Sequence, residues 1–156
     1  MDNAIKIGLL KDEYLLLQKF YEDFDGRIVT IKGWSATIGL AAIGAGFYQS
    51  RFLWLFAAGA AMVFWLVEAL WKSFQYMYAP RIQELEKAFA NDSFDGIAPL
   101  QVYTSWFSQF HNHGLGIFSN VRLGIVAFPH FVTVIAGISL FVLQAFGFIH
   151  LPAKTP

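Results

Sequence analysis

The chain has 156 residues, of which 56% are hydrophobic and only 14% are charged, and 17 are phenylalanines. Soluble domains usually have about a quarter of their residues charged, so this composition predicts a single membrane domain over residues 1–156 with no attached enzyme. Eleven basic residues balance eleven acidic ones, which gives no support for nucleic-acid binding. Because cysteine is absent, disulfides, thiolate metal sites and cysteine nucleophiles are excluded.

The first predicted element is a continuous helix over residues 4–48, a cytoplasmic stalk that leads into a transmembrane span. Its apolar side chains recur in alternating steps of four and three, the spacing of a heptad seam, at Leu10, Tyr14, Leu17, Tyr21, Phe24, Ile28 and Ile31. The charged residues between them are expected to face water and include Lys11, Asp12, Glu13, Lys19, Glu22, Asp23 and Asp25. The uncharged run 33–50 would extend about 27 Å as a helix, close to the thickness of the bilayer core.

A second span and stalk are predicted over residues 52–90. The run 52–67 is uncharged, so together with the first span it predicts a transmembrane helical hairpin. An apolar face then continues through Trp71, Phe74, Tyr78, Ile82, Leu85 and Phe89, and it predicts a stalk that packs antiparallel to the first. Arg81, Glu84, Glu86 and Lys87 are expected to lie largely off this face. Pro80 predicts a kink or a new helix start because it has no amide proton.

Small residues spaced four apart mark possible packing faces within the spans. The pairs are Ser35 and Gly39, Ala42 and Gly46, and Ala57 and Ala61. Small side chains let helix backbones approach closely, which is a main source of helix association in lipid. These faces either close the hairpin within one protomer or seal an oligomer.

The last third of the chain predicts an interfacial segment and a third span. Residues 99–121 contain Tyr103, Trp106, Phe107, Phe110 and Phe118 but few charges, which favours a helix or re-entrant turn lying on the inner leaflet. From residue 123 to residue 153 there is no Asp, Glu, Lys or Arg. We therefore expect one tilted or kinked transmembrane helix over residues 123–149.

Polar residues near the membrane-facing runs are the candidate functional residues. Glu68 lies near the cytoplasmic end of the second span, with Lys72 one turn later and Lys32 and Ser35 at a similar depth on the first helix. Ionisable groups are costly at such a depth and usually have a partner or a function. Glu68 either pairs with Lys72 or Lys32, or gates an ion path.

Histidines give two further possibilities. His130 follows Pro129 in the third span, where it is either a proton sensor, because imidazole changes charge near neutral pH, or a donor to a carbonyl that the proline leaves free. His111 and His113 lack a cysteine or nearby carboxylate, so we predict neither a metal site nor a cofactor. No phosphate loop, nucleophile elbow or zinc motif is present, and we expect no enzymatic activity.

Loop charges predict the orientation. With the N-terminus in the cytoplasm, nine basic residues lie inside and two, Arg51 and Lys154, lie outside. The nine are Lys6, Lys11, Lys19, Arg27, Lys32, Lys72, Arg81, Lys87 and Arg122. The three spans then place the C-terminus outside.

Residues 32–37 (KGWSAT) and the run 65–86, with Glu68, Trp71, Lys72, Gln75, Tyr78, Arg81 and Glu86, resemble small prokaryotic membrane proteins of the SLATT type. The resemblance covers roughly residues 10–90. It implies a homo-oligomeric pore-forming or membrane-perturbing effector of phage defence, regulated by a cytosolic protein. The alternative is a non-conducting membrane anchor or scaffold that recruits a soluble partner.

Overall fold

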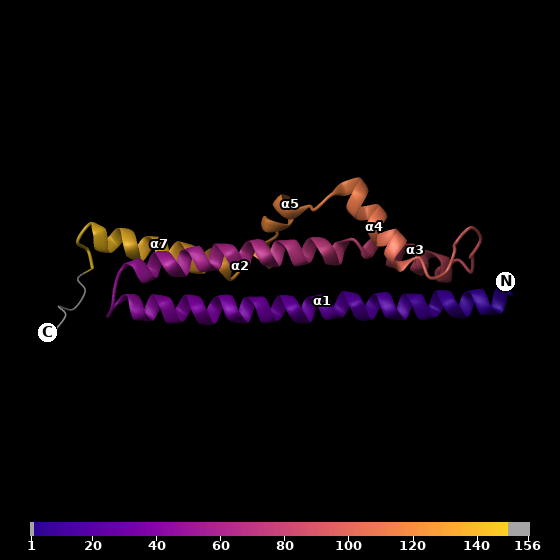
Figure 1. Cartoon of the computed structure of the whole chain (residues 1–156), viewed down its shortest axis with the longest axis horizontal. Coiled ribbons are helices and arrows are strands. Elements are labelled where there is room, and N and C mark those ends of the chain that lie inside the picture. Colours follow the sequence, from indigo (N-terminus) through magenta and orange to yellow (C-terminus); the bar gives the residue numbers. More distant parts are fainter. Residues whose placement is uncertain (1, 150–156) are drawn as a thin grey trace. The chain divides into compact units, whose positions relative to one another are not determined.

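The computed structural model describes residues 2–149, and these residues are helical with no strand, which confirms the all-α prediction. Figure 1 colours the helices in chain order and labels all of them except α6. They are α1 (Asn3–Gly46), α2 (Phe52–Tyr76), α3 (Ala79–Ala90), α4 (Val102–His113), α5 (Ile117–Val121), α6 (Gly124–Ala127) and α7 (His130–Ala145). The first helix has 44 residues, close to the range 4–48 expected from the heptad seam and the apolar run that follows it.

The contacts divide the chain into two compact units, where the length led us to expect a single domain. The stalk unit contains the residues up to Arg27 together with Leu70–Gly116. The apolar unit contains Ile28–Ala69 and the residues from Ile117 onward. Each unit contains one part of α1 and one part of α2. It therefore combines segments that are far apart in the sequence.

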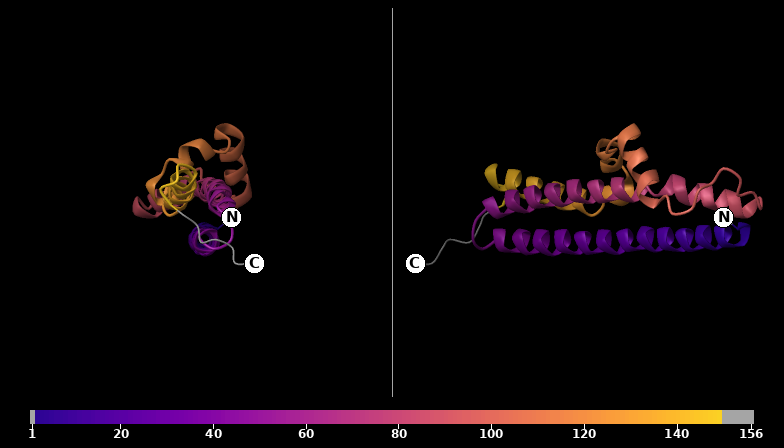
Figure 2. Two further views of the ribbon diagram at one scale, coloured as in Figure 1. Left: turned by 90° about the vertical axis from the view of Figure 1, so that its left-hand side faces the viewer. Right: turned by 45° about the vertical axis from the view of Figure 1, so that its right-hand side comes forward.

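The stalk unit is built on the first part of the heptad seam. Leu10 and Leu17 of α1 are fully buried against Ile82 and Leu85 of α3, and α3 lies along the N-terminal part of α1 in Figures 1 and 2. The apolar face of the second stalk is interrupted where expected, since α2 ends at Tyr76 and α3 begins at Ala79, just before Pro80. Proline is tolerated in the first turn of a helix because the amides there have no partner within the helix.

Two charged residues of the stalk unit are buried, which corrects the expectation that Glu13 faces water and that Arg81 lies off the packed face. Glu13 is 1% exposed and Arg81 is 5% exposed. Their side chains form a two-pronged ion pair, with Nε to Oε1 at 2.9 Å and Nη2 to Oε2 at 3.1 Å. The prediction failed because it considered only two packed helices, whereas the loop after α3 also covers this position.

That loop is fastened directly to the ion pair. The backbone amides of Leu100 and Gln101 donate to the Glu13 carboxylate at 2.7 and 3.2 Å, and Arg81 donates to the carbonyl of Ala98 at 2.7 Å. Burial alone would lower the pKa of the Arg81 guanidinium, but its hydrogen bonds to Glu13 and Glu84 and their charges raise the pKa above its usual value.

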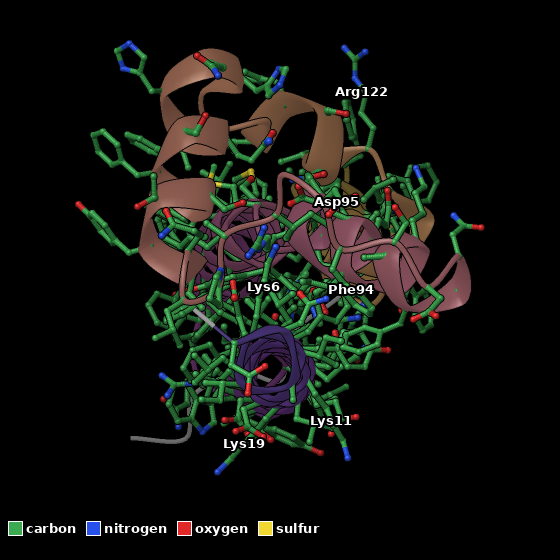
Figure 3. All side chains as sticks on the ribbon, turned by 90° about the vertical axis from the view of Figure 1, so that its right-hand side faces the viewer. Lys6, Lys11, Lys19, Phe94, Asp95 and Arg122 are labelled. Carbon is green, nitrogen blue, oxygen red and sulfur yellow. The ribbon has the colours of Figure 1, made fainter. Side chains whose placement is uncertain are left out.

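The opposite sides of the first stalk differ in character. Figure 3 shows that Lys6 points toward the segment carrying Phe94, whereas Lys11 and Lys19 project from the other side of α1. Lys6 Nζ donates to the carbonyl of Phe94 at 2.7 Å. One side of the stalk therefore holds the loop after α3, and the other presents solvated charges.

The apolar unit is a bundle of the distal parts of α1 and α2 with α7, which lies alongside α2 in the views of Figure 2. Trp54 is fully buried in this bundle and donates from its indole nitrogen to the carbonyl of Ile43 at 3.0 Å. A Cβ atom added to Gly137 of α7 would lie 2.4 Å from the carbonyl oxygen of Trp54. Such close backbone approach is typical of helix packing that uses small residues.

Two helices, α1 and the helix that starts at Phe52, are long and apolar enough to cross a membrane. The third apolar run, expected as one tilted or kinked transmembrane helix over residues 123–149, is divided into α6 and α7. The chain breaks between α6 and α7, because Phe128 is extended before Pro129 and a proline cannot donate the hydrogen bond that would continue the helix. The remaining helix, α7, has 16 residues and is about 24 Å long.

The predicted interfacial segment 99–121 is also divided. It forms α4 and α5, which are separated by Gly114 with a φ of 61°. This backbone conformation costs little only for glycine, so the chain turns at Gly114 and α4 cannot run on into α5.

Candidate functional site

Four side chains from three helices form a connected polar network in the apolar unit. Ser35 Oγ lies 2.7 Å from His130 Nδ1, and His130 Nε2 lies 3.0 Å from Glu68 Oε2. Lys32 Nζ lies 3.2 Å from the other carboxylate oxygen, Glu68 Oε1, and donates to the carbonyl of Ile125 at 2.6 Å. We call Lys32, Ser35, Glu68 and His130 the polar network.

Features of the local sequence explain how members of the network come to face one another. Lys32 and Ser35 are three residues apart and therefore on one face of α1. His130 is the first residue of α7, directly after the break at Pro129. This break turns the imidazole toward α1 and α2, so both ring nitrogens bond to side chains, and the alternative of donation to a carbonyl freed by Pro129 is not adopted.

Burial makes the network electrostatically demanding. Ser35, Glu68 and His130 are at most 2% exposed, whereas the Lys32 side chain is 24% exposed. One imidazole tautomer suits both ring contacts: with its proton on Nε2 the ring donates to Glu68, and its Nδ1 accepts the hydroxyl proton of Ser35.

One oxygen of the network is incompletely satisfied. The Lys32 ammonium is within ion-pair distance of Glu68 Oε1 but lacks hydrogen-bond geometry, so this buried oxygen has no hydrogen-bond partner among the described residues. A buried charged oxygen without a hydrogen bond is costly. The Lys32–Glu68 contact therefore depends on charge attraction.

Lys72, which we expected near the same carboxylate, belongs to a different cluster. Its ammonium lies 3.2 Å from Asp25 Oδ1 and 5.3 Å from the centre of the Tyr76 ring, all within the stalk unit. Of the two ion pairs that the sequence left open for Glu68, the structure contains the pair with Lys32.

The succession of hydroxyl, imidazole and carboxylate is also the order of a hydrolase proton relay. A hydrolase requires its nucleophile to reach a substrate, but Ser35 is only 2% exposed and His130 is fully buried. The contacts of Ser35, Glu68 and His130 instead join α1, α2 and α7 inside the apolar unit.

The small residues predicted to pack helices are all buried in the apolar unit. These are Gly39, Ala42, Gly46, Ala57 and Ala61. A Cβ atom on Gly39 would lie 2.6 Å from the methyl carbon of Thr133, and one on Gly46 would lie 2.2 Å from the Trp54 indole nitrogen. These faces are therefore used inside the protomer, and any contact between protomers has to use other surfaces.

A second polar cluster marks the far end of the apolar unit. The Arg51 guanidinium lies 5.5 and 5.4 Å from the ring centres of Phe52 and Phe141, and it donates to Gln144 Oε1 at 3.2 Å. Along α2, Arg51 and Glu68 are separated by about 26 Å of helix rise. An apolar section of nearly bilayer thickness therefore lies between the two clusters.

Sequence reasoning grouped Lys32 and Ser35 with Glu68, because they lie at a similar depth, but it did not link His130 to them. His130 was noted only for its position after Pro129. The signal that points to His130 as a junction residue is its place directly after Pro129, because a helix that restarts there presents its first side chain at the end of the bundle.

No group of three or more histidine, cysteine, aspartate or glutamate side chains within the described range 2–149 is arranged to hold a metal ion. Comparisons with protein-family models, curated proteins and solved structures find no match to this chain. The class of protein therefore has to be argued from the fold and the polar network.

Proposed function

We propose that the chain is an integral membrane protein in which α1, α2 and α7 cross the bilayer. Support comes from the apolar section between the polar network and Arg51, and from large apolar side chains that point out of it. Phe56, Val63 and Leu66 of α2 are 58, 60 and 55% exposed. Such surfaces are unfavourable in water and are covered by lipid in a membrane. The distribution of basic residues supports an orientation with the N-terminus in the cytoplasm and the C-terminus outside.

Within this class we propose a homo-oligomeric membrane effector or channel-like protein, similar to the SLATT type and acting in prokaryotic antiphage defence. The observation that carries this proposal is the polar network. Ionisable groups at membrane depth are costly and usually mark a functional site, and this set joins all three membrane helices at one end. In the proposed resting state the network holds α7 against the hairpin. The stalk unit receives the signal, from a cytosolic regulatory protein, that releases it.

A second function is favoured by a different observation. The interior of the apolar unit is closed by direct packing, with Gly39 against Thr133, Gly46 against Trp54, and Gly137 against the Trp54 backbone. A protomer packed in this way offers no polar path of its own. The alternative is a non-conducting membrane anchor whose stalk unit recruits a soluble partner.

Reconstituted protein distinguishes the two functions. The purified chain is placed in nanodiscs to determine its oligomeric state and in dye-loaded liposomes to measure release. The effector predicts an oligomer, slow release from the wild type, and faster release from Glu68→Gln and Ser35→Ala, because both substitutions weaken the network. Glu84→Gln is the matched control, since the Glu84 side chain is 50% exposed and lies in the stalk unit.

Ser35→Ala removes only a hydroxyl group and should remain folded even if Glu68→Gln does not assemble. A monomer that releases no dye as wild type or as Ser35→Ala contradicts the effector and favours the anchor.

A further inference from the structure

The exposed face of α4 consists of two parallel ridges of different chemistry. Tyr103, Phe107 and His111 recur every four residues and stack on one another, with ring centres 5.8 and 6.4 Å apart and planes within 20°. Thr104, Ser108 and Asn112 form the neighbouring ridge, in which Asn112 Nδ2 donates to Ser108 Oγ at 3.2 Å. All six residues are exposed.

The other face of α4 is held by the stalk unit. Trp106 donates from its indole nitrogen to the carbonyl of Phe74 at 3.2 Å, and its ring stacks on Phe110 with centres 5.6 Å apart. No residue of α4 is buried, and its sequence contains no Asp, Glu, Lys or Arg. The aromatic ridge is therefore presented outward on a helix that contains no carboxylate, ammonium or guanidinium side chain.

A short connection joins α4 to α5. Three residues separate His113 from Ile117, where α5 begins, so this connection spans at most about 15 Å. The far end of α5 is fixed by a hydrogen bond from the Trp65 indole to the carbonyl of Val121 at 3.0 Å. Trp65 is one turn from Glu68, so α5 lies at the depth of the polar network, where the proposed membrane section ends.

We propose that the ridge of Tyr103, Phe107 and His111 docks onto the cytoplasmic-leaflet interface of the membrane that holds the apolar unit. Aromatic side chains are favoured at this depth, where the ring is apolar and its edge is hydrated, while the hydroxyl and amide ridge faces the headgroups. Phe118 of α5, which belongs to the apolar unit, is itself 88% exposed. The inference rests on the proposed membrane insertion. It gives α4 the role of a lipid-bound strut for the stalk unit.

Since the chain has no cysteine, single nitroxide labels can test the docking directly. Labels are placed in proteoliposomes at Phe107→Cys on the aromatic ridge, at Ser108→Cys on the polar ridge as the matched control, and at Leu66→Cys as the reference for insertion. Docking predicts that the label at position 107 is more accessible to oxygen than to a water-soluble nickel complex. The label at position 108 should show the reverse. Both accessibilities are measured as the relaxation enhancement of the nitroxide.

Each outcome has a separate meaning. If the label at position 66 is lipid-exposed but those at 107 and 108 are equally open to nickel, the ridge faces water and the docking is wrong, while membrane insertion stands. Strong spin–spin broadening at position 107 shows that a second copy covers the ridge and also overturns the docking. If the label at position 66 is itself open to nickel, membrane insertion fails and the docking falls with it.

Discussion

The Lys32–Glu68 pair is the residue contact on which the stability of the apolar unit depends most directly. Glu68→Gln removes the charge that faces Lys32, so we expect a loss of roughly 3 kcal/mol, the low end for breaking a buried pair because Lys32 is partly exposed. Thermal unfolding in detergent, followed by circular dichroism, measures the loss.

The double substitution Lys32→Met and Glu68→Gln tests the physical reason for this loss. Without the ammonium no unpaired charge remains, so most of the lost stability should return. A double variant as unstable as Glu68→Gln would show that the carboxylate acts mainly through His130 and that the ion pair adds little.

For the Glu13–Arg81 pair of the stalk unit we expect a different result, because the Glu13 carboxylate also accepts hydrogen bonds from two backbone amides. Glu13→Gln leaves the buried guanidinium with only the half-exposed Glu84 carboxylate as its counter-charge, and we expect a loss of about 3 kcal/mol, the low end for breaking a buried pair. Replacing both partners, as Glu13→Leu with Arg81→Met, should restore only part of this stability, since the amides of Leu100 and Gln101 still lose their acceptor.

Hydrogen exchange at those two amides is the measurement, and faster exchange is expected in both variants. Unchanged exchange would contradict the role of Glu13 in fastening the loop after α3.

At the scale of the helix, close packing of α7 on α2 is tested with glycine substitutions. A Cβ on Gly137 would lie 2.4 Å from a backbone oxygen that cannot rotate away, so Gly137→Ala should destabilise the apolar unit by about 1–3 kcal/mol. Gly59→Ala is the control: nothing lies within 4 Å of its Cβ, and alanine favours a helix by up to about 1 kcal/mol. Thermal unfolding of the two variants should shift in opposite directions, and equal shifts would contradict the packing.

The helices themselves were largely predictable, because helical periodicity is a local property of the sequence. The seam from Leu10 to Ile31 faces the interior of each unit, with Leu10, Leu17, Ile28 and Ile31 at most 6% exposed. The break before Pro80 was predicted from the missing amide proton. The separation of two helices at Pro129 was not predicted, because an uninterrupted apolar run suggested a single tilted or kinked span. The missing amide proton nevertheless applies equally to Pro80 and Pro129.

At the scale of the whole molecule, the proposed orientation predicts which loops are accessible from each side of the membrane. Single cysteines at Gln49 in the turn between α1 and α2, and at Asp95 in the loop after α3, are both exposed. In intact cells a membrane-impermeant maleimide should label position 49 and spare position 95, which reacts only after lysis. The reverse pattern would place the N-terminus outside.

The sequence alone determined the all-helical class, the two long apolar helices and the seam, because each follows from composition or from spacing within one helix. Only the tertiary structure decided that Glu68 meets Lys32 and His130, that Glu13 and Arg81 are buried, and that the third apolar run restarts at His130. Ser35 and His130 are 95 positions apart and Glu13 and Arg81 are 68 apart. Contacts over such separations depend on which helices and loops pack on one another. The spacing of apolar residues within one helix does not specify its packing partners.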